Sequence, residues 1–196
     1  MNVSRETSKR LQAYLELLKN WSAKINLVAP ATIEDAWERH IEDSLQLLDL
    51  RPSPGPIWTD LGTGGGLPGL VIAMALPSQE TETVLVESDQ RKAAFLRHVI
   101  RTLEIQQTRV IAERIEVISG LGASTLTARA LAPLPKLMTY VERHLGPSGT
   151  ALLPKGRNWR EEVAAAQLSW QFELTAHPSK TQPEAAVLEI RDIHAR

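Results

Sequence analysis

Apolar residues recur every three or four positions through the first 50 residues, which is the period of an amphipathic helix. One such run begins after Ser4, and a second extends from about Thr32 to Leu50. Residues 51–56 then contain three prolines and one glycine, a composition that ends a helix and connects segments. The pattern predicts one domain in which residues 1–54 form a helical extension and residues 55–196 form the core.

Beyond residue 55 the pattern changes to short β-rich runs that alternate with helical ones. Strands are expected at residues 57–61, 83–87, 109–112, 124–130 and 149–155, with helices between them. Two last runs, at residues 170–176 and 185–191, have no helix between them and predict an antiparallel pair. The expected fold is α/β: a doubly wound, mainly parallel, seven-stranded Rossmann-like sheet with an antiparallel edge, which binds ligands outside the carboxyl ends of its strands.

Composition adds limits to this fold. A chain of 196 residues with 43% hydrophobic and 23% charged residues has the size and balance of one globular domain. It contains no cysteine, which excludes disulfides and thiolate metal sites. The charged start and the lack of a long apolar run predict a cytoplasmic protein that does not enter a membrane.

The net charge of −1 provides no overall basic field for nucleic acid. Basic residues are nevertheless concentrated between residues 91 and 114, where they outnumber the acidic ones. Such a cluster could follow a phosphate backbone, although the solvated side of a helix is the simpler interpretation.

The run from Ile57 to Gly69 joins an apolar strand to a turn dense in glycine, where a ligand can approach the backbone closely. Gly64–Gly69 matches G-x-G-x-x-G, and Glu87 ends the next strand, as in a dinucleotide site. Asp60–Gly66 matches D-x-G-x-G-x-G, which suits S-adenosylmethionine, because its sulfonium and amino-acid tail favour a carboxylate at the strand end. Pro68 has no amide hydrogen at the position where a phosphate-binding helix begins, and this favours the second ligand.

Six segments carry a family resemblance, and in chain order they are Asn26–Val28, Arg39–Ser44, Asp60–Gly69, Glu87–Arg97, Ala128–Ala130 and Lys155–Gly156. Together they closely resemble the RsmG (GidB) methyltransferases of bacterial 16S rRNA. The resemblance extends from about Trp21 to Lys155. It implies transfer of a methyl group from S-adenosylmethionine to N7 of a single guanine, guanine-527 in the family's naming.

The resemblance also implies which residues bind the cofactor: Gly62, Gly64, Leu67, Glu87, Ile115, Glu116 and Arg129. Glu87 is expected to bond the ribose hydroxyls, and Ile115 with Glu116 to contact the adenine. Arg129 is expected near the methionine end of the cofactor. Without the resemblance, Arg129 would more simply be interpreted as a member of a surface ion pair. Glu87 could equally well be a surface carboxylate.

On the substrate side, the resemblance implies Asn26, Arg39, His40, Asp43 and Lys155. His40 and Asp43 are three residues apart and share one face of their helical segment. By itself, His40 is better explained as a hydrogen-bonded structural residue, and Lys155 equally well as an exposed lysine. In the matched motifs, His40 is expected to form a wall of the active site, and Lys155 to lie where RNA phosphate can be met.

Guanine N7 already has a free lone pair, so its methylation requires no general base, and we expect neither a catalytic base nor a metal. In-line positioning and exclusion of water are expected to carry the reaction. The expected partner is 16S rRNA, free or in the 30S particle, and the protein is expected to be a monomer. The glycine turn leaves two alternatives: an NAD(P)-dependent oxidoreductase and a cofactor-binding protein without activity.

Overall fold

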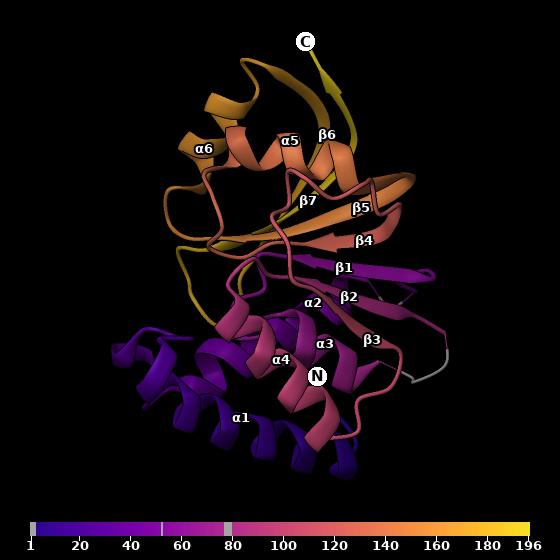
Figure 1. Ribbon diagram of the computed structural model, residues 1–196. Helices are drawn as coiled ribbons and strands as arrows, with labels where there is room; N and C mark the ends of the chain where they lie inside the picture. Colours follow the sequence, from indigo (N-terminus) through magenta and orange to yellow (C-terminus); the bar gives the residue numbers. More distant parts are fainter. Residues whose placement is uncertain (1–2, 52, 77–79) are drawn as a thin grey trace.

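A seven-stranded sheet forms the centre of the part of the chain that the computed structural model describes, residues 3–51, 53–76 and 80–196 (Figure 1). The strand order is β3-β2-β1-β4-β5-β7-β6. The strands are β1 Ile57–Leu61, β2 Glu82–Val86, β3 Thr108–Ile111, β4 Ala123–Thr127, β5 Leu145–Lys155, β6 Trp170–Pro178 and β7 Ala186–Ala195.

Strands β1 to β5 pair in parallel, whereas β7 is antiparallel to both β5 and β6. The predicted mainly parallel sheet with an antiparallel edge is therefore confirmed. The chain order of the strands reverses between β1 and β4, which are neighbours. The loops that follow these two strands leave the same edge of the sheet, and ligands of doubly wound folds bind at such a switch point.

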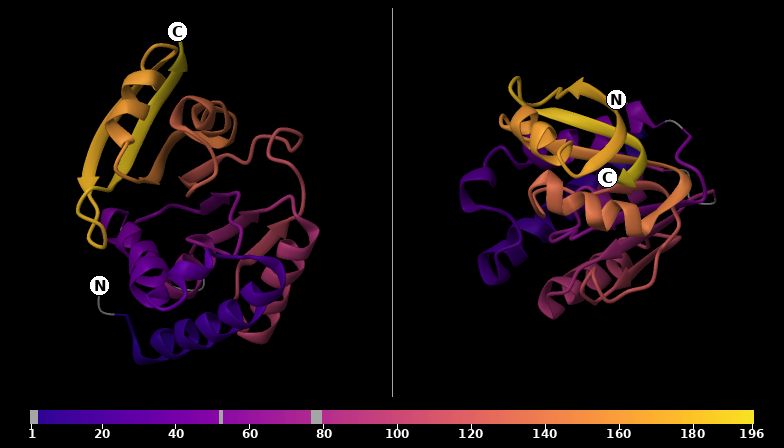
Figure 2. Two further views of the ribbon diagram at one scale, coloured as in Figure 1. Left: turned by 90° about the vertical axis from the view of Figure 1, so that its left-hand side faces the viewer. Right: turned by 90° about the horizontal axis from the view of Figure 1, so that it is seen from above.

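Helices cover both faces of the sheet (Figures 1 and 2). The helical elements are α1 Arg5–Ile25, η1 Pro30–Thr32, η2 Trp37–Glu42, α2 Asp43–Leu50, α3 Gly69–Ala75, α4 Gln90–Thr102, α5 Leu134–His144 and α6 Trp159–Ala166. The first hydrophobic cluster joins residues of α1, α2, α3 and α4 to the sheet, and the second joins α5 and α6 to the opposite face. None of the described helices has both the length and the hydrophobicity to span a bilayer.

Local sequence signals explain where the helices begin and end. The Ser4 hydroxyl accepts a hydrogen bond from the amide of Thr7, and the Asp89 carboxylate accepts one from that of Arg91 (3.0 and 2.8 Å). Both residues are therefore N-caps. At the other end of α1, Asn26 takes the left-handed conformation (φ 52°) that often closes a helix.

The second helical segment differs from the prediction of one helix over residues 32–50. The structure has a short 3₁₀ turn, η1, then the π-helical η2, and only then α2. Pro30 begins η1, and the Thr32 hydroxyl donates to the carbonyl of Ala29 at 2.7 Å, which closes that turn. Of the connector at residues 51–56, Pro52 lies outside the described residues.

Candidate active site

Asp60, at the end of β1, holds the glycine turn from within. Its side chain is fully buried and accepts hydrogen bonds from the Thr63 hydroxyl, the Gly69 amide (2.9 Å) and the Thr127 hydroxyl (2.9 Å). Burial raises the pKa of Asp60 to about 6, against the opposing effect of these three hydrogen bonds. Both oxygens of this carboxylate are bonded to the protein, and its contact with the amino-acid tail of a cofactor stays a prediction.

The turn itself requires glycine. Gly62 and Gly64 have φ of 64° and 57°, a region that other residues rarely adopt. A Cβ on Gly62 would come within 2.5 Å of Leu131, whereas a Cβ on Gly64 would meet only a carbonyl oxygen at 4.0 Å and would project into open space. The buried Tyr14 of α1 donates a hydrogen bond to the Gly65 carbonyl at 2.7 Å and holds the turn from the opposite side.

A first cavity of about 400 Å³, the turn cavity, opens beside this turn. Five of the seven predicted cofactor residues line it, namely Gly62, Gly64, Glu87, Ile115 and Glu116. The two oxygens of Glu87 accept hydrogen bonds from the amides of Gly64 (2.9 Å) and Asp89 (2.8 Å). Glu87 is thus fixed against the glycine turn, with its carboxylate at the cavity wall.

Three side chains of α5 hold the loop that carries Ile115 and Glu116. The Tyr140 hydroxyl donates to the Glu116 carboxylate at 2.6 Å, a bond that raises the pKa of Tyr140 and lowers that of Glu116. Arg143 donates twice to another loop carbonyl, at 3.0 and 2.8 Å. His144 lies 3.1 Å from the Ile115 carbonyl, and burial lowers the pKa of its imidazole.

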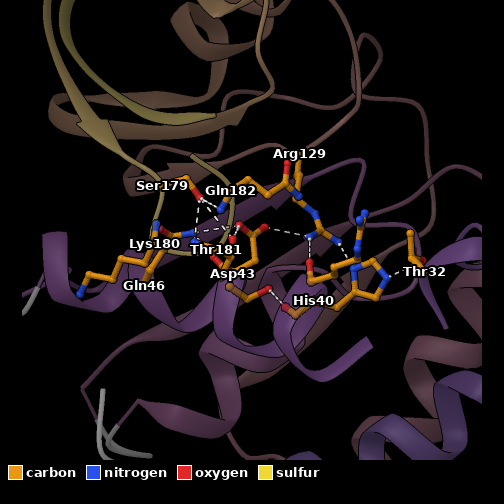
Figure 3. A network of polar contacts seen from close by, with 11 residues as sticks. Thr32, His40, Asp43, Gln46, Arg129, Ser179, Lys180, Thr181 and Gln182 are labelled. Atoms are coloured by element: carbon orange, nitrogen blue, oxygen red, sulfur yellow. Dashed lines mark hydrogen bonds and ion pairs between the residues drawn. The ribbon is translucent and has the colours of Figure 1, made fainter. Parts of the chain in front are cut away.

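A second cavity of about 490 Å³, the arginine cavity, lies beside the first. It brings together four of the five predicted substrate residues and the remaining polar cofactor residue, namely Arg39, His40, Asp43, Lys155 and Arg129. One Arg129 nitrogen donates to Asp43 at 3.0 Å and to the carbonyl of Arg39 at 3.2 Å (Figure 3). Ala130, next in the chain, lines both cavities, which therefore meet at the loop after β4.

His40 is hydrogen-bonded through both ring nitrogens (Figure 3). Nδ1 lies 3.3 Å from a nitrogen of Arg129, which can only donate, so Nδ1 is the acceptor and Nε2 carries the proton. That proton is directed to the Thr32 hydroxyl at 2.9 Å. Burial and the charge of Arg129 lower the pKa of His40 to about 4, so the imidazole is neutral at physiological pH.

Asp43 connects three segments of the chain (Figure 3). Besides binding Arg129, it accepts hydrogen bonds from Gln46 (2.8 Å) and from Thr181 in the loop between β6 and β7 (2.9 Å). Gln46 in turn accepts from the amide of Lys180 at 2.9 Å. Neither Gln46 nor Thr181 was among the predicted residues. Thr181 is 138 positions from Asp43, and the sequence carries no signal for that contact.

Lys155 is bound within the protein. Its ammonium donates to the carbonyl of Ala132 and to the carboxylate of Glu162, both at 2.8 Å, and only 9% of its side chain is exposed. The interpretation as an exposed lysine is therefore wrong. A contact between Lys155 and RNA phosphate stays a prediction.

Two predicted residues line neither cavity. Leu67 is 5% exposed and packs in the first hydrophobic cluster. Asn26 is exposed and closes α1. The structure gives these residues roles in packing and in helix termination, and their predicted contacts with ligands stay predictions.

Comparisons with known proteins agree with this geometry. A family model described as GidB, rRNA small subunit methyltransferase G, matches residues 7–187. The chain is 54% identical to the ribosomal RNA small subunit methyltransferase G of Paracoccus denitrificans, over 97% of both chains. It is 46% identical to the protein of the same name from Gluconobacter oxydans, over 97% of this chain and 96% of the other.

Solved structures resemble the fold at much lower identity. A methyltransferase from Aquifex aeolicus that depends on S-adenosylmethionine has a TM-score of 0.63 at 9% identity, over 91% of this chain and 98% of the other. A mutant of MtNAS in complex with S-adenosylmethionine has a TM-score of 0.62 at 16% identity, over 94% of this chain and 75% of the other. The family model and the full-length relatives confirm the resemblance found in the sequence: the chain belongs to the rRNA small subunit methyltransferase G (GidB) family.

Proposed function

We propose that this protein transfers the methyl group of S-adenosylmethionine to N7 of one guanine in 16S rRNA, the guanine-527 of the family's naming. One observation carries the proposal: the turn cavity and the arginine cavity meet at Ala130, which lines both. One cavity can hold a nucleoside-like cofactor while the other admits a base. Methyl transfer requires such neighbouring sites, because both reactants must be held in line.

The turn cavity fits the adenosine part of S-adenosylmethionine. The open space beside Gly64 lets a ligand approach the backbone, and Glu87 offers acceptors for the two ribose hydroxyls. The buried Ile115 provides an apolar surface for the adenine, and Glu116, fixed by Tyr140, provides a polar edge. The methionine end would then extend past Ala130 toward Arg129.

When bound, S-adenosylmethionine supplies an electrophilic methyl group on a cationic sulfur. The protein has only to position guanine N7, whose lone pair attacks directly, and to exclude water. His40 fits this requirement, because both of its nitrogens are engaged and it is not available as a base. Asp43 compensates the charge of Arg129, so the arginine does not repel the cationic product.

The dinucleotide alternative receives no support from the start of α3. The helix begins after Pro68, which has no amide hydrogen, and the next amide, that of Gly69, donates to the buried Asp60. A diphosphate would need these amides. The structure therefore offers no helix N-terminus to a dinucleotide at this turn.

The proposed substrate is 16S rRNA, either free or within the 30S particle, and the protein is proposed to act as a monomer in the cytoplasm. The test is incubation of the purified protein with labelled S-adenosylmethionine and either naked 16S rRNA or 30S particles. We expect one base-labile N7-methylguanine in one of these substrates. Label at another atom or on another base would contradict the proposal, and stabilisation of the protein by NAD but not by S-adenosylhomocysteine would contradict the cofactor.

A further inference from the structure

Glu162, on the first turn of α6, lies at the boundary between the arginine cavity and an adjoining groove of about 620 Å³. It lines both of them, together with Arg39, Gly156, Gln182 and Ala185. The side chain of Glu162 is 28% exposed. It belongs to no segment that suggested a ligand site in the sequence.

The protein holds Glu162 through only one of its two oxygens. Oε2 accepts hydrogen bonds from the Leu134 amide at 2.7 Å and from the Lys155 ammonium at 2.8 Å. Among the residues that the structure describes, none donates a hydrogen bond to Oε1. The carboxylate is therefore fixed in position and retains acceptor capacity on its second oxygen.

The other carboxylate of the arginine cavity is differently placed. Asp43 accepts hydrogen bonds on both oxygens, from Gln46 and Thr181 on one and from Arg129 on the other. Glu162 is thus the carboxylate of this cavity that keeps one oxygen without a donor from the described residues.

We propose that Glu162 recognises the target base by accepting hydrogen bonds from N1–H and N2–H of guanine. The proposal rests on the proposed function, since it concerns the base that this site would methylate. Guanine presents two adjacent N–H donors on its Watson–Crick edge, and a carboxylate accepts both. Adenine, cytosine and uracil each place an acceptor beside their donor on that edge, so a carboxylate binds them less well.

This mode of binding suits the reaction. An unstacked base is commonly read through its Watson–Crick edge. When that edge is bound by Glu162, the opposite Hoogsteen edge with N7 stays free for the methyl group. Glu162 compensates the charge of Lys155 as Asp43 compensates that of Arg129, so neither of these two cations repels the cationic product base.

The test changes each partner of the proposed contact in turn: the base, by replacing guanosine with inosine, and the carboxylate, by Glu162→Gln. Inosine lacks the N2 amino group of guanine and keeps N7. The substrate, rRNA or 30S particle as the wild-type protein requires, carries either guanosine or inosine at the target position. We expect the wild-type kcat/KM to fall about 10-fold or more on inosine, since a hydrogen bond to a charged group is lost. In Glu162→Gln, we expect methylation of guanosine to fall, and the inosine penalty to shrink to about 3-fold or less.

The matched control is Glu161→Gln, because Glu161 is exposed on the same helical turn and lines neither cavity. It should retain the wild-type inosine penalty. An undiminished inosine penalty in Glu162→Gln would overturn the proposal, because a role limited to supporting Lys155 would affect both substrates equally. Failure of the wild-type protein to methylate the guanosine substrate would instead contradict the proposed function itself.

Discussion

At the scale of single residues, the Asp43 carboxylate decides how the arginine cavity is held together. It pairs with Arg129, whose side chain is only 19% exposed, and it also binds the loop between β6 and β7 through Thr181. Removal of one partner of a largely buried ion pair leaves the other charge without compensation, which costs more than the pair itself contributes. Asp49 makes an ion pair to the same loop, with Lys180, whose side chain is 60% exposed.

We expect Asp43→Asn to lower the free energy of unfolding by about 2–3 kcal/mol, because the guanidinium of Arg129 stays partly buried without its counter-charge. Asp49→Asn should cost less than about 1 kcal/mol, since exposed ion pairs contribute little. Urea denaturation of both variants measures the difference. Equal losses in the two variants would show that burial of the Arg129 pair has no energetic consequence.

At the scale of elements, α5 shapes the turn cavity although it contributes little to its lining. Its three side chains at positions 140, 143 and 144 lie on one face of the helix and bond to the loop after β3. The hydrogen bond that Tyr140 donates to Glu116 raises the pKa of the phenol. The adenine-binding surface of the proposed site therefore depends on a helix that lies beside it.

We expect Tyr140→Phe to weaken S-adenosylhomocysteine binding about 3- to 10-fold, which corresponds to the loss of one hydrogen bond that positions Glu116. Calorimetric titration measures the effect. Thr139→Val is the control, because the Thr139 hydroxyl is exposed and bonds only to a carbonyl of its own helix. If Tyr140→Phe binds as tightly as the control, α5 does not position the loop.

Residue patterns predicted the elements well because the alternation of short strands and helices is a local signal. The antiparallel pair at residues 170–191 and the start of the first helix after Ser4 followed from such signals. The buried state of Asp60 did not, because one of its donors, Thr127, is 67 positions away and meets it only in the folded chain. The same holds for Arg129 and Asp43, which are 86 positions apart and whose pairing no periodicity encodes.

At the scale of the whole molecule, the N-terminal helices are packed into the core as one structure with it (Figure 2). The first hydrophobic cluster contains Leu11 and Leu18 of α1 together with Leu70 of α3 and Phe95 of α4. Trp21 of α1 also contacts the ring of Phe95, with centroids 5.4 Å apart. The extension thus covers apolar surface that the core alone would expose to water.

The packing of α1 predicts that residues 55–196 do not fold cooperatively without the extension, whereas the full chain unfolds in a single transition. The truncated chain should show no sharp thermal transition and should bind a hydrophobic dye, since Leu70 and Phe95 lose their cover.

Tyr14→Phe separates the effect of the extension on the site from its effect on folding. It removes only the hydroxyl that bonds to the Gly65 carbonyl, so we expect a cooperative fold that is about 1–2 kcal/mol less stable and binds S-adenosylhomocysteine more weakly. Cooperative unfolding of residues 55–196 with full affinity for S-adenosylhomocysteine would contradict this account, because the glycine turn would then keep its shape without α1.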